Sequence, residues 1–150
     1  MRLGFFQPDI PQNVGAGLRL GACFGVGVDI VGPAAFALTD KGLRHAAMDY
    51  SGRDDIRRVS GFDAWAEETA REGGRILLMT TKAATPLWDH AFQPSDRILM
   101  GSESAGAPDA IHARADARLL IPLAPGARSL NVVTAAAIAL GEAVRQGAAG

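Results

Sequence analysis

The chain has 150 residues, of which 48% are hydrophobic and 21% charged, as expected for one soluble domain with a substantial core. No apolar run approaches the roughly twenty residues of a membrane span, and the N-terminus has no signal-peptide-like apolar region, so we expect a cytoplasmic protein. The formal net charge of −1 excludes the strongly basic composition typical of nucleic-acid-binding domains, and the lone Cys23 excludes an internal disulfide and a cysteine-based zinc cluster.

The hydrophobic pattern predicts strands and helices in alternation. A strand is expected over 3–7, and Asn13 is then predicted to cap a helix over 14–24, in which Cys23 would be a small buried residue. Further strands are predicted over 28–31, 56–59, 76–80, 97–100 and 118–123, and further helices over 41–48, 62–72, 108–114 and 131–146. This order predicts an α/β fold in which a mostly parallel sheet carries helices on both faces, within a single domain over 1–150.

The last predicted helix is lined almost entirely by small residues, which would let another backbone or a flat ligand come close. Arg128, Ser129 and Asn131 precede this helix, where a strand leads into it. Ligands of open α/β sheets bind at such carboxyl ends of strands, so we expect a binding site here. The small residues of the helix are Ala135, Ala136, Ala137, Ala139, Gly141 and Ala143.

Two other turns carry groups suited to chemistry. Arg19 follows Gly15 by four residues, so its side chain would reach over the glycine toward the N-terminus of the helix; alternatively, its stem covers apolar surface. Glu103 lies in the glycine-bounded turn 101–106, where it would accept hydrogen bonds from a ribose or from backbone amides, or cap a purely structural turn. The turn 101–106 lacks the spacing of a dinucleotide-binding motif and the lysine of a P-loop.

Together, in this order, the three segments resemble the SPOUT superfamily of RNA methyltransferases. Within it the chain is similar to the TrmH-like group of TrmL type, which methylates the ribose 2′-oxygen of the tRNA wobble nucleotide. The resemblance covers nearly the whole chain. The matching segments are 7–15 with Arg19, 40–44, Met48-Asp49-Tyr50, 80–82, 99–103, 121–123 and 128–131.

The resemblance implies a C-terminal trefoil knot and a homodimer whose site is completed across the interface. It implies S-adenosylmethionine as cofactor, no metal, and a tRNA substrate with cytidine or uridine at position 34, tRNA-Leu isoacceptors being expected. The residues that would bind the cofactor are Met79, Thr80, Gly101, Ile121, Ser129 and Leu130.

For catalysis the resemblance implies Arg19, either as an unusual base or as the cation that stabilises the ribose oxygen as it loses its proton. We prefer this role to that of a base because arginine is almost never deprotonated in proteins. Asn13, Glu103, Ser129 and Asn131 would hold Arg19 and the ribose. Lys41, Arg44 and Arg128 would contact RNA phosphates.

The chain also departs from the pattern of the group. Ser102 replaces a proline, Ala105 an arginine and Val133 a serine. These differences leave two alternatives open: methylation of another tRNA or ribosomal RNA site, and a non-catalytic α/β protein that binds RNA or a nucleotide.

Overall fold

The computed structural model describes residues 1–37, 39 and 55–150 of the chain. Strands and helices alternate through this part, as predicted, and the helix predicted over 41–48 lies outside the described residues. The strands are β1 (Arg2–Phe6), β2 (Gly27–Val31), β3 (Ile56–Val59), β4 (Ile76–Met79), β5 (Thr85–Pro86), β6 (Arg97–Met100) and β7 (Ala117–Leu120). The helices are α1 (Pro11–Phe24), α3 (Phe62–Arg71), the 3-10 turn η1 (Leu87–Asp89), α4 (Asp109–Arg114) and α5 (Val132–Arg145).

The strands form one sheet in the order β3-β2-β1-β6-β4-β7-β5, and every neighbouring pair is parallel. This confirms the predicted α/β class. Since the strands run in one direction, their carboxyl ends lie at one edge of the sheet. The chain proceeds from β1 to β2 on one side, while β6, which comes much later, pairs on the other side. Binding sites of open α/β sheets form beside such a switch in strand order.

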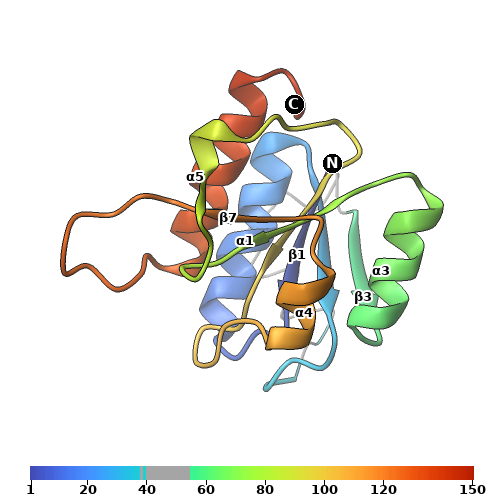
Figure 1. Ribbon diagram of the computed structural model, residues 1–150. Coiled ribbons are helices and arrows are strands. Elements are labelled where there is room, and N and C mark those ends of the chain that lie inside the picture. Colours follow the sequence, from blue (N-terminus) through green and yellow to red (C-terminus); the bar gives the residue numbers. More distant parts are fainter. Residues whose placement is uncertain (38, 40–54) are drawn as a thin grey trace.

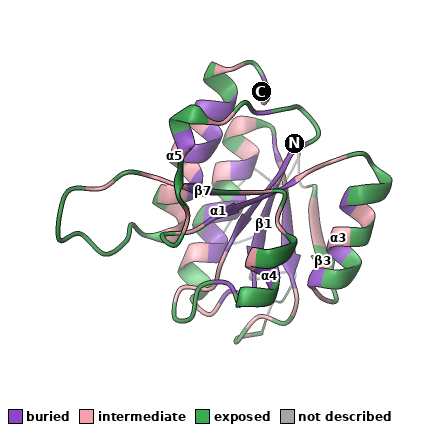
Figure 2. Ribbon diagram, in the orientation of Figure 1, coloured by how far each residue is buried: buried purple, intermediate pink, exposed green. Residues whose placement is uncertain are grey.

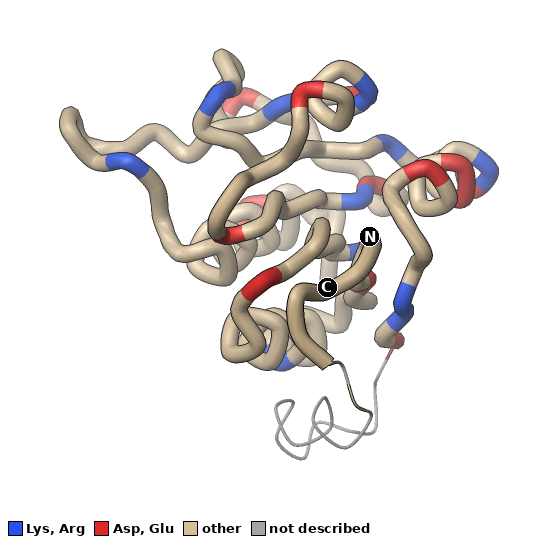
Figure 3. The backbone as a smooth tube through the Cα atoms, turned by 90° about the horizontal axis from the view of Figure 1, so that it is seen from below, with Lys and Arg blue, Asp and Glu red and all other residues tan. Residues whose placement is uncertain are grey.

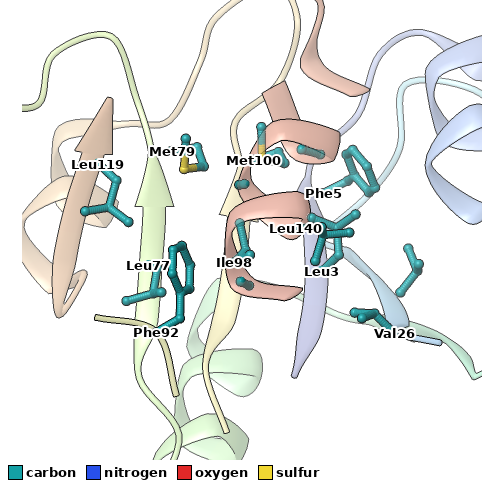
Figure 4. Packing of buried hydrophobic residues seen from close by; sticks show 14 of the residues in the cluster. Leu3, Phe5, Val26, Leu77, Met79, Phe92, Ile98, Met100, Leu119 and Leu140 are labelled. Carbon is teal, nitrogen blue, oxygen red and sulfur yellow. The ribbon is translucent and has the colours of Figure 1, made fainter. Parts of the chain in front are cut away.

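Alternate residues of the central strands enter two separate cores, one on each face of the sheet. Leu3 and Phe5 pack with α1 and α5, whereas Phe6 packs with α3 and α4 on the opposite face. Figure 4 shows the first core beneath α5, and Figure 2 shows that the central strands are buried along their length. Figure 1 shows the sheet between the two helix layers, as the continuous apolar strands predict.

The small residues of α5 allow it to pack closely on the sheet. Ala136, Ala139 and Ala143 are fully buried in the core that α5 shares with α1, and Ala135 faces the pocket described below. Gly141 behaves differently, because a Cβ added to it would have no atom within 4 Å. The wall of small residues is therefore confirmed at the three alanines, while Gly141 contributes no close contact.

Several sequence predictions at element ends are wrong. Asn13 does not cap α1, since the helix begins at Pro11 after Ile10, and a proline is well tolerated at a first helical position. Asn13 therefore lies within the first turn with its side chain free to bond elsewhere. Cys23 is exposed rather than buried, because it lies on the solvent side of α1.

Other differences concern the second half of the chain. Strand β7 ends at Leu120 rather than at residue 123, and α4 begins one residue after Pro108. The edge strand β5 and the turn η1 were not predicted. A two-residue strand that pairs only with β7 leaves no periodic signal in the sequence.

A buried ionic cluster lies under α3, away from the carboxyl edge of the sheet. The Asp29 carboxylate accepts hydrogen bonds from Arg2, Arg57 and the indole N–H of Trp65, at 2.6–3.2 Å. Burial by itself would raise the pKa of Asp29, but these hydrogen bonds hold it below its usual value. Arg97, buried nearby, pairs with Glu72. The cluster anchors α3 to the sheet and does not line the pocket.

Candidate functional site

Four loops meet at the carboxyl edge of the sheet, following the adjacent strands β1, β6, β4 and β7. They enclose a pocket of about 570 Å³, within the range of small-molecule sites. All six residues predicted to bind a cofactor line it: Met79, Thr80, Gly101, Ile121, Ser129 and Leu130. Asn13, Glu103 and Asn131 line it as well, so the pocket unites the three segments that the sequence singled out.

A chain of side-chain hydrogen bonds joins these three segments. The side-chain oxygen Oδ1 of Asn131 caps α5 by accepting the N–H groups of Val133 at 2.9 Å and Thr134 at 3.2 Å. Its amide N–H therefore faces outward and donates to Asn13 Oδ1 at 3.0 Å. Asn13 Nδ2 in turn donates to Glu103 Oε1 at 3.0 Å. Because each amide uses its oxygen on one side and its nitrogen on the other, both have one defined orientation.

Glu103 and Asp9 bind each other's loops reciprocally. The second oxygen of Glu103 accepts the Asp9 backbone N–H at 2.9 Å. The Asp9 carboxylate accepts the N–H groups of Glu103 at 3.1 Å and Ser104 at 3.3 Å, together with the Ser104 hydroxyl. Hydrogen bonds with Glu103 and Ser104 lower the pKa of Asp9 to about 2. The loop after β1 is thus held to the loop after β6, and the prediction that Glu103 holds a backbone amide is confirmed.

The turn after β6 leaves room for a ligand because it folds back tightly on itself. Ser102 and Gly106 exchange backbone hydrogen bonds at 3.1 and 2.9 Å. A Cβ on Gly101 would lie only 2.6 Å from the Gly106 carbonyl carbon, so this position requires glycine. Apolar side chains line another part of the pocket, over the strand ends; they include Met100, Leu119, Leu123, Val132 and Ala135. The pocket therefore has a polar side and an apolar side.

Sequence reasoning missed His112, which lines the same pocket from α4. Its Nε2 lies 2.9 Å from the Thr80 hydroxyl, and its Nδ1 lies 3.1 Å from the Pro108 carbonyl oxygen. A histidine one turn after a proline, just beyond a glycine-rich turn, was the available signal. Lys82, in a segment that matches the resemblance, also lines the pocket.

Arg19 and Arg128, the predicted cations within the described residues, lie outside the pocket of their own chain. Arg19 is exposed on α1 while Gly15 is buried, and neither lines the pocket. Arg128 lies on the exposed segment between β7 and α5, which projects from the body of the protein (Figure 1). Lys41 and Arg44, like Met48-Asp49-Tyr50, lie outside the described residues. Of the departures from the family pattern, Ser102 and Ala105 line the pocket and Val133 does not.

Charges of both signs are interspersed along the described part of the chain (Figure 3). Over these residues there is no group of three or more histidine, cysteine, aspartate or glutamate side chains arranged to hold a metal ion. Within the same ranges, no helix is long and apolar enough to cross a membrane.

Known proteins with similar sequences are RNA-modifying enzymes. A relative from Beijerinckia indica subsp. indica is 52% identical over 147 residues, covering 96% of this chain and 90% of its own, and is named tRNA (cytidine(34)-2'-O)-methyltransferase. A relative of the same name from Ancylobacter novellus is 49% identical over 146 residues, with 97% of this chain and 92% of the relative covered.

Solved structures that resemble this chain are also described as methyltransferases or in terms of RNA methylation. One, described as "Structural insights into the 2-OH methylation of C/U34 on tRNA", matches with a TM-score of 0.90 at 34% identity and covers 97% of this chain and 94% of that one. The SpoU methyltransferase AviRb from Streptomyces viridochromogenes, solved with its cofactor AdoMet, matches at 27% identity with a TM-score of 0.82; 98% of this chain and 60% of AviRb are covered. These similarities define the class as methyltransferases. The model of the SpoU rRNA Methylase family matches residues 1–141, and the chain belongs to this family.

Proposed function

We propose that the pocket binds S-adenosylmethionine and that the protein transfers its methyl group to the ribose 2′-oxygen of nucleotide 34, a cytidine or uridine, of tRNA. The observation that carries this proposal is the single pocket in which the six expected cofactor residues adjoin the hydrogen-bonded chain of Asn131, Asn13 and Glu103. The names of the two relatives and the bound AdoMet of AviRb support it.

The pocket suits this cofactor in size and chemistry. Its volume of about 570 Å³ accommodates a nucleoside with an amino-acid tail. The apolar side, which includes Met79, Ile121 and Leu130, suits an adenine ring, and the glycine at position 101 lets the turn that lines the pocket close on the Gly106 backbone. When bound, S-adenosylmethionine supplies an electrophilic methyl group on a positively charged sulfur.

The residues of this chain would act mainly by positioning the ribose. The 2′-hydroxyl must lie in line with the methyl group, and its proton leaves as the new oxygen–carbon bond forms. Asn13, Ser129 and Asn131 line the pocket and orient the ribose, while Glu103 fixes the amide of Asn13. Arg19 stabilises negative charge on the reacting oxygen.

The position of Arg19 outside the pocket of its own chain fits a site that two copies complete. In the proposed homodimer, Arg19 of one protomer reaches the pocket of its partner. Each chain forms one domain over 1–150 with a knotted C-terminal segment and acts in the cytoplasm. Lys41, Arg44 and Arg128 contact RNA phosphates; because the charge on each chain is close to neutral, such local contacts from two protomers would provide the attraction.

A second candidate is a site in ribosomal RNA, because the matching family is described as rRNA methylases. One experiment separates the two: labelled S-adenosylmethionine is incubated with the protein and with either total tRNA or ribosomal RNA from a strain lacking the gene, and the modified nucleotide is mapped. We expect label at position 34 of tRNA, with tRNA-Leu isoacceptors as the first species to test. Label only in ribosomal RNA favours the second candidate, and cofactor binding without label in any RNA refutes enzymatic activity.

Replacing Arg19 tests its role separately. We expect Arg19→Ala to abolish turnover while the dimer persists in analytical ultracentrifugation, because the side chain acts on charge in the transition state. Turnover equal to that of the unmodified protein would refute this assignment.

A further inference from the structure

His112 joins two walls of the pocket that are otherwise separate loops. It lies on α4, which follows the turn after β6, and its ring contacts Thr80 in the turn after β4. Strands β4 and β6 are neighbours in the sheet, so the two turns lie side by side at its carboxyl edge. Both His112 and Thr80 line the pocket.

The partners of the imidazole determine where its proton lies. The Pro108 carbonyl oxygen can only accept a hydrogen bond, so Nδ1, at 3.1 Å, must carry the ring proton. In the neutral ring Nε2 is then an acceptor. The Thr80 hydroxyl, at 2.9 Å, must donate its proton to it.

The same hydroxyl fixes the backbone of its own turn. Its oxygen accepts the Lys82 N–H at 3.2 Å, while its proton is directed to His112. The Thr80 N–H is bonded to the Leu119 carbonyl at 2.9 Å. The hydroxyl and the N–H of Thr80 therefore both have protein partners. Three hydrogen bonds therefore order the turn over residues 80–82, which lines the pocket.

We propose that His112 is a positioning residue of the cofactor pocket: as the Nδ1–H tautomer it accepts the Thr80 hydroxyl proton and so fixes the turn after β4 in the shape that receives S-adenosylmethionine. This inference rests on the proposed function for the identity of the ligand. It adds a residue that the sequence did not indicate, and a purpose for the Thr80 hydroxyl. Without the hydrogen bond, the turn would have to be ordered by the ligand itself, which lowers affinity.

A double-mutant cycle on binding of S-adenosylhomocysteine, measured by calorimetry, tests this coupling. We expect His112→Ala to weaken binding about five- to tenfold, the value of one net hydrogen bond. Thr80→Val should weaken it at least as much, because it also removes the acceptor of the Lys82 N–H. The double variant should bind about as weakly as Thr80→Val alone, since His112 acts only through that hydroxyl. Thr80→Ser, which keeps the hydroxyl, should restore most of the affinity. Additive losses, or unchanged binding by Thr80→Val, would overturn the proposal.

Two controls keep the outcome specific. Arg114→Ala changes the same short helix but removes contacts that lie outside the pocket, an ion pair with Asp63 and a cation–π contact with Phe62, so binding should stay as in the unmodified protein. Thr80→Val conserves the shape of the side chain, so the binding measured for this variant tests the proposal even if His112→Ala folds poorly. If the unmodified protein fails to bind S-adenosylhomocysteine, the proposed function and this inference both fail. If it binds and Thr80→Val binds equally well, only this inference fails.

The tautomer of His112 provides a second test, because a histidine that only packed against its neighbours would have no preferred nitrogen for its proton. Long-range ¹⁵N–¹H spectra of His112 should show the proton on Nδ1 in the unmodified protein. A proton on Nε2 would overturn the proposed direction of the hydrogen bonds.

Discussion

The hydrogen bonds that link Asn131, Asn13 and Glu103 at the pocket predict how Glu103→Gln would change activity. Glutamine has nearly the shape of glutamate, but it offers one acceptor oxygen in place of two. Glu103 accepts from both the Asn13 amide and the Asp9 backbone N–H. Whichever way the new amide turns, its NH₂ group faces one of these donors, so one hydrogen bond is lost.

The magnitude follows from the charge of the acceptor. Hydrogen bonds to charged groups contribute about 1.5–3 kcal/mol, and the partial exposure of Glu103 favours the lower end, or about a tenfold effect. Loss at Asn13 would release an amide proposed to orient the ribose. We therefore expect kcat/KM for tRNA to fall about ten- to a hundredfold, while the affinity for S-adenosylhomocysteine changes by less than about threefold.

The assay is transfer of labelled methyl groups to tRNA, with cofactor binding measured in parallel. Glu67→Gln is a matched control, because it makes the same chemical change at an exposed position on α3, outside the pocket. A Glu103→Gln enzyme with kcat/KM within about twofold of the unmodified protein would refute the idea that this carboxylate orders the site.

Three further predictions concern stability, measured by urea unfolding. Asp29→Asn should lower the free energy of unfolding by about 3–5 kcal/mol, because it removes the buried carboxylate to which both Arg2 and Arg57 are bonded. Asp63→Asn, in an exposed pair, should cost less than about 1 kcal/mol, and equal losses would contradict the role of the buried cluster. Gly141→Ala should raise the free energy of unfolding by about 0.5–1 kcal/mol, because the added methyl group meets no atom within 4 Å and the unfolded chain loses conformational freedom. A loss of stability would contradict the open space at this position. Asp9 has a pKa of about 2 in the folded protein, below its ordinary 3.8, so its contribution to the free energy of unfolding is present above about pH 4 and is lost as the pH falls toward 2. Between about pH 5 and pH 2, Asp9→Asn should therefore lose less stability than the unmodified protein. Parallel curves of unfolding free energy against pH for the two proteins would contradict this.

Local patterns along the chain predicted the central architecture well. The continuous apolar runs at 76–79 and 97–100 indicated strands covered on both faces, because such residues need apolar neighbours on each side. The predicted start of the last helix at residue 131 is right to within one residue, because Asn131 caps the helix by accepting amides only two and three residues ahead. Motif resemblance, in turn, identified residues of the pocket that no periodicity would single out.

Predictions failed where the deciding interactions come from distant segments or from one helix face. Cys23 is apolar enough for a core, but the sequence did not reveal that it lies on the outer side of α1. Asn13 has the side-chain chemistry of a helix cap, but the helix begins earlier, at Pro11. The Asn13 side-chain amide instead donates to Glu103, 90 residues away. The pairing of β5 with β7 likewise depends on a strand that follows it by about thirty residues.

Periodicity, capping and motifs are local properties of the chain, so the α/β class, most of its elements and the three segments that carry chemistry follow from the order of the amino acids alone. Tertiary packing brings these segments into one pocket, links Asn131, Asn13 and Glu103 in a directed hydrogen-bond chain, and places His112 against Thr80. The physical reason is that parallel strands distant in sequence bring their carboxyl ends to the same edge. Hydrogen bonds across that edge depend on atomic positions that no single segment specifies.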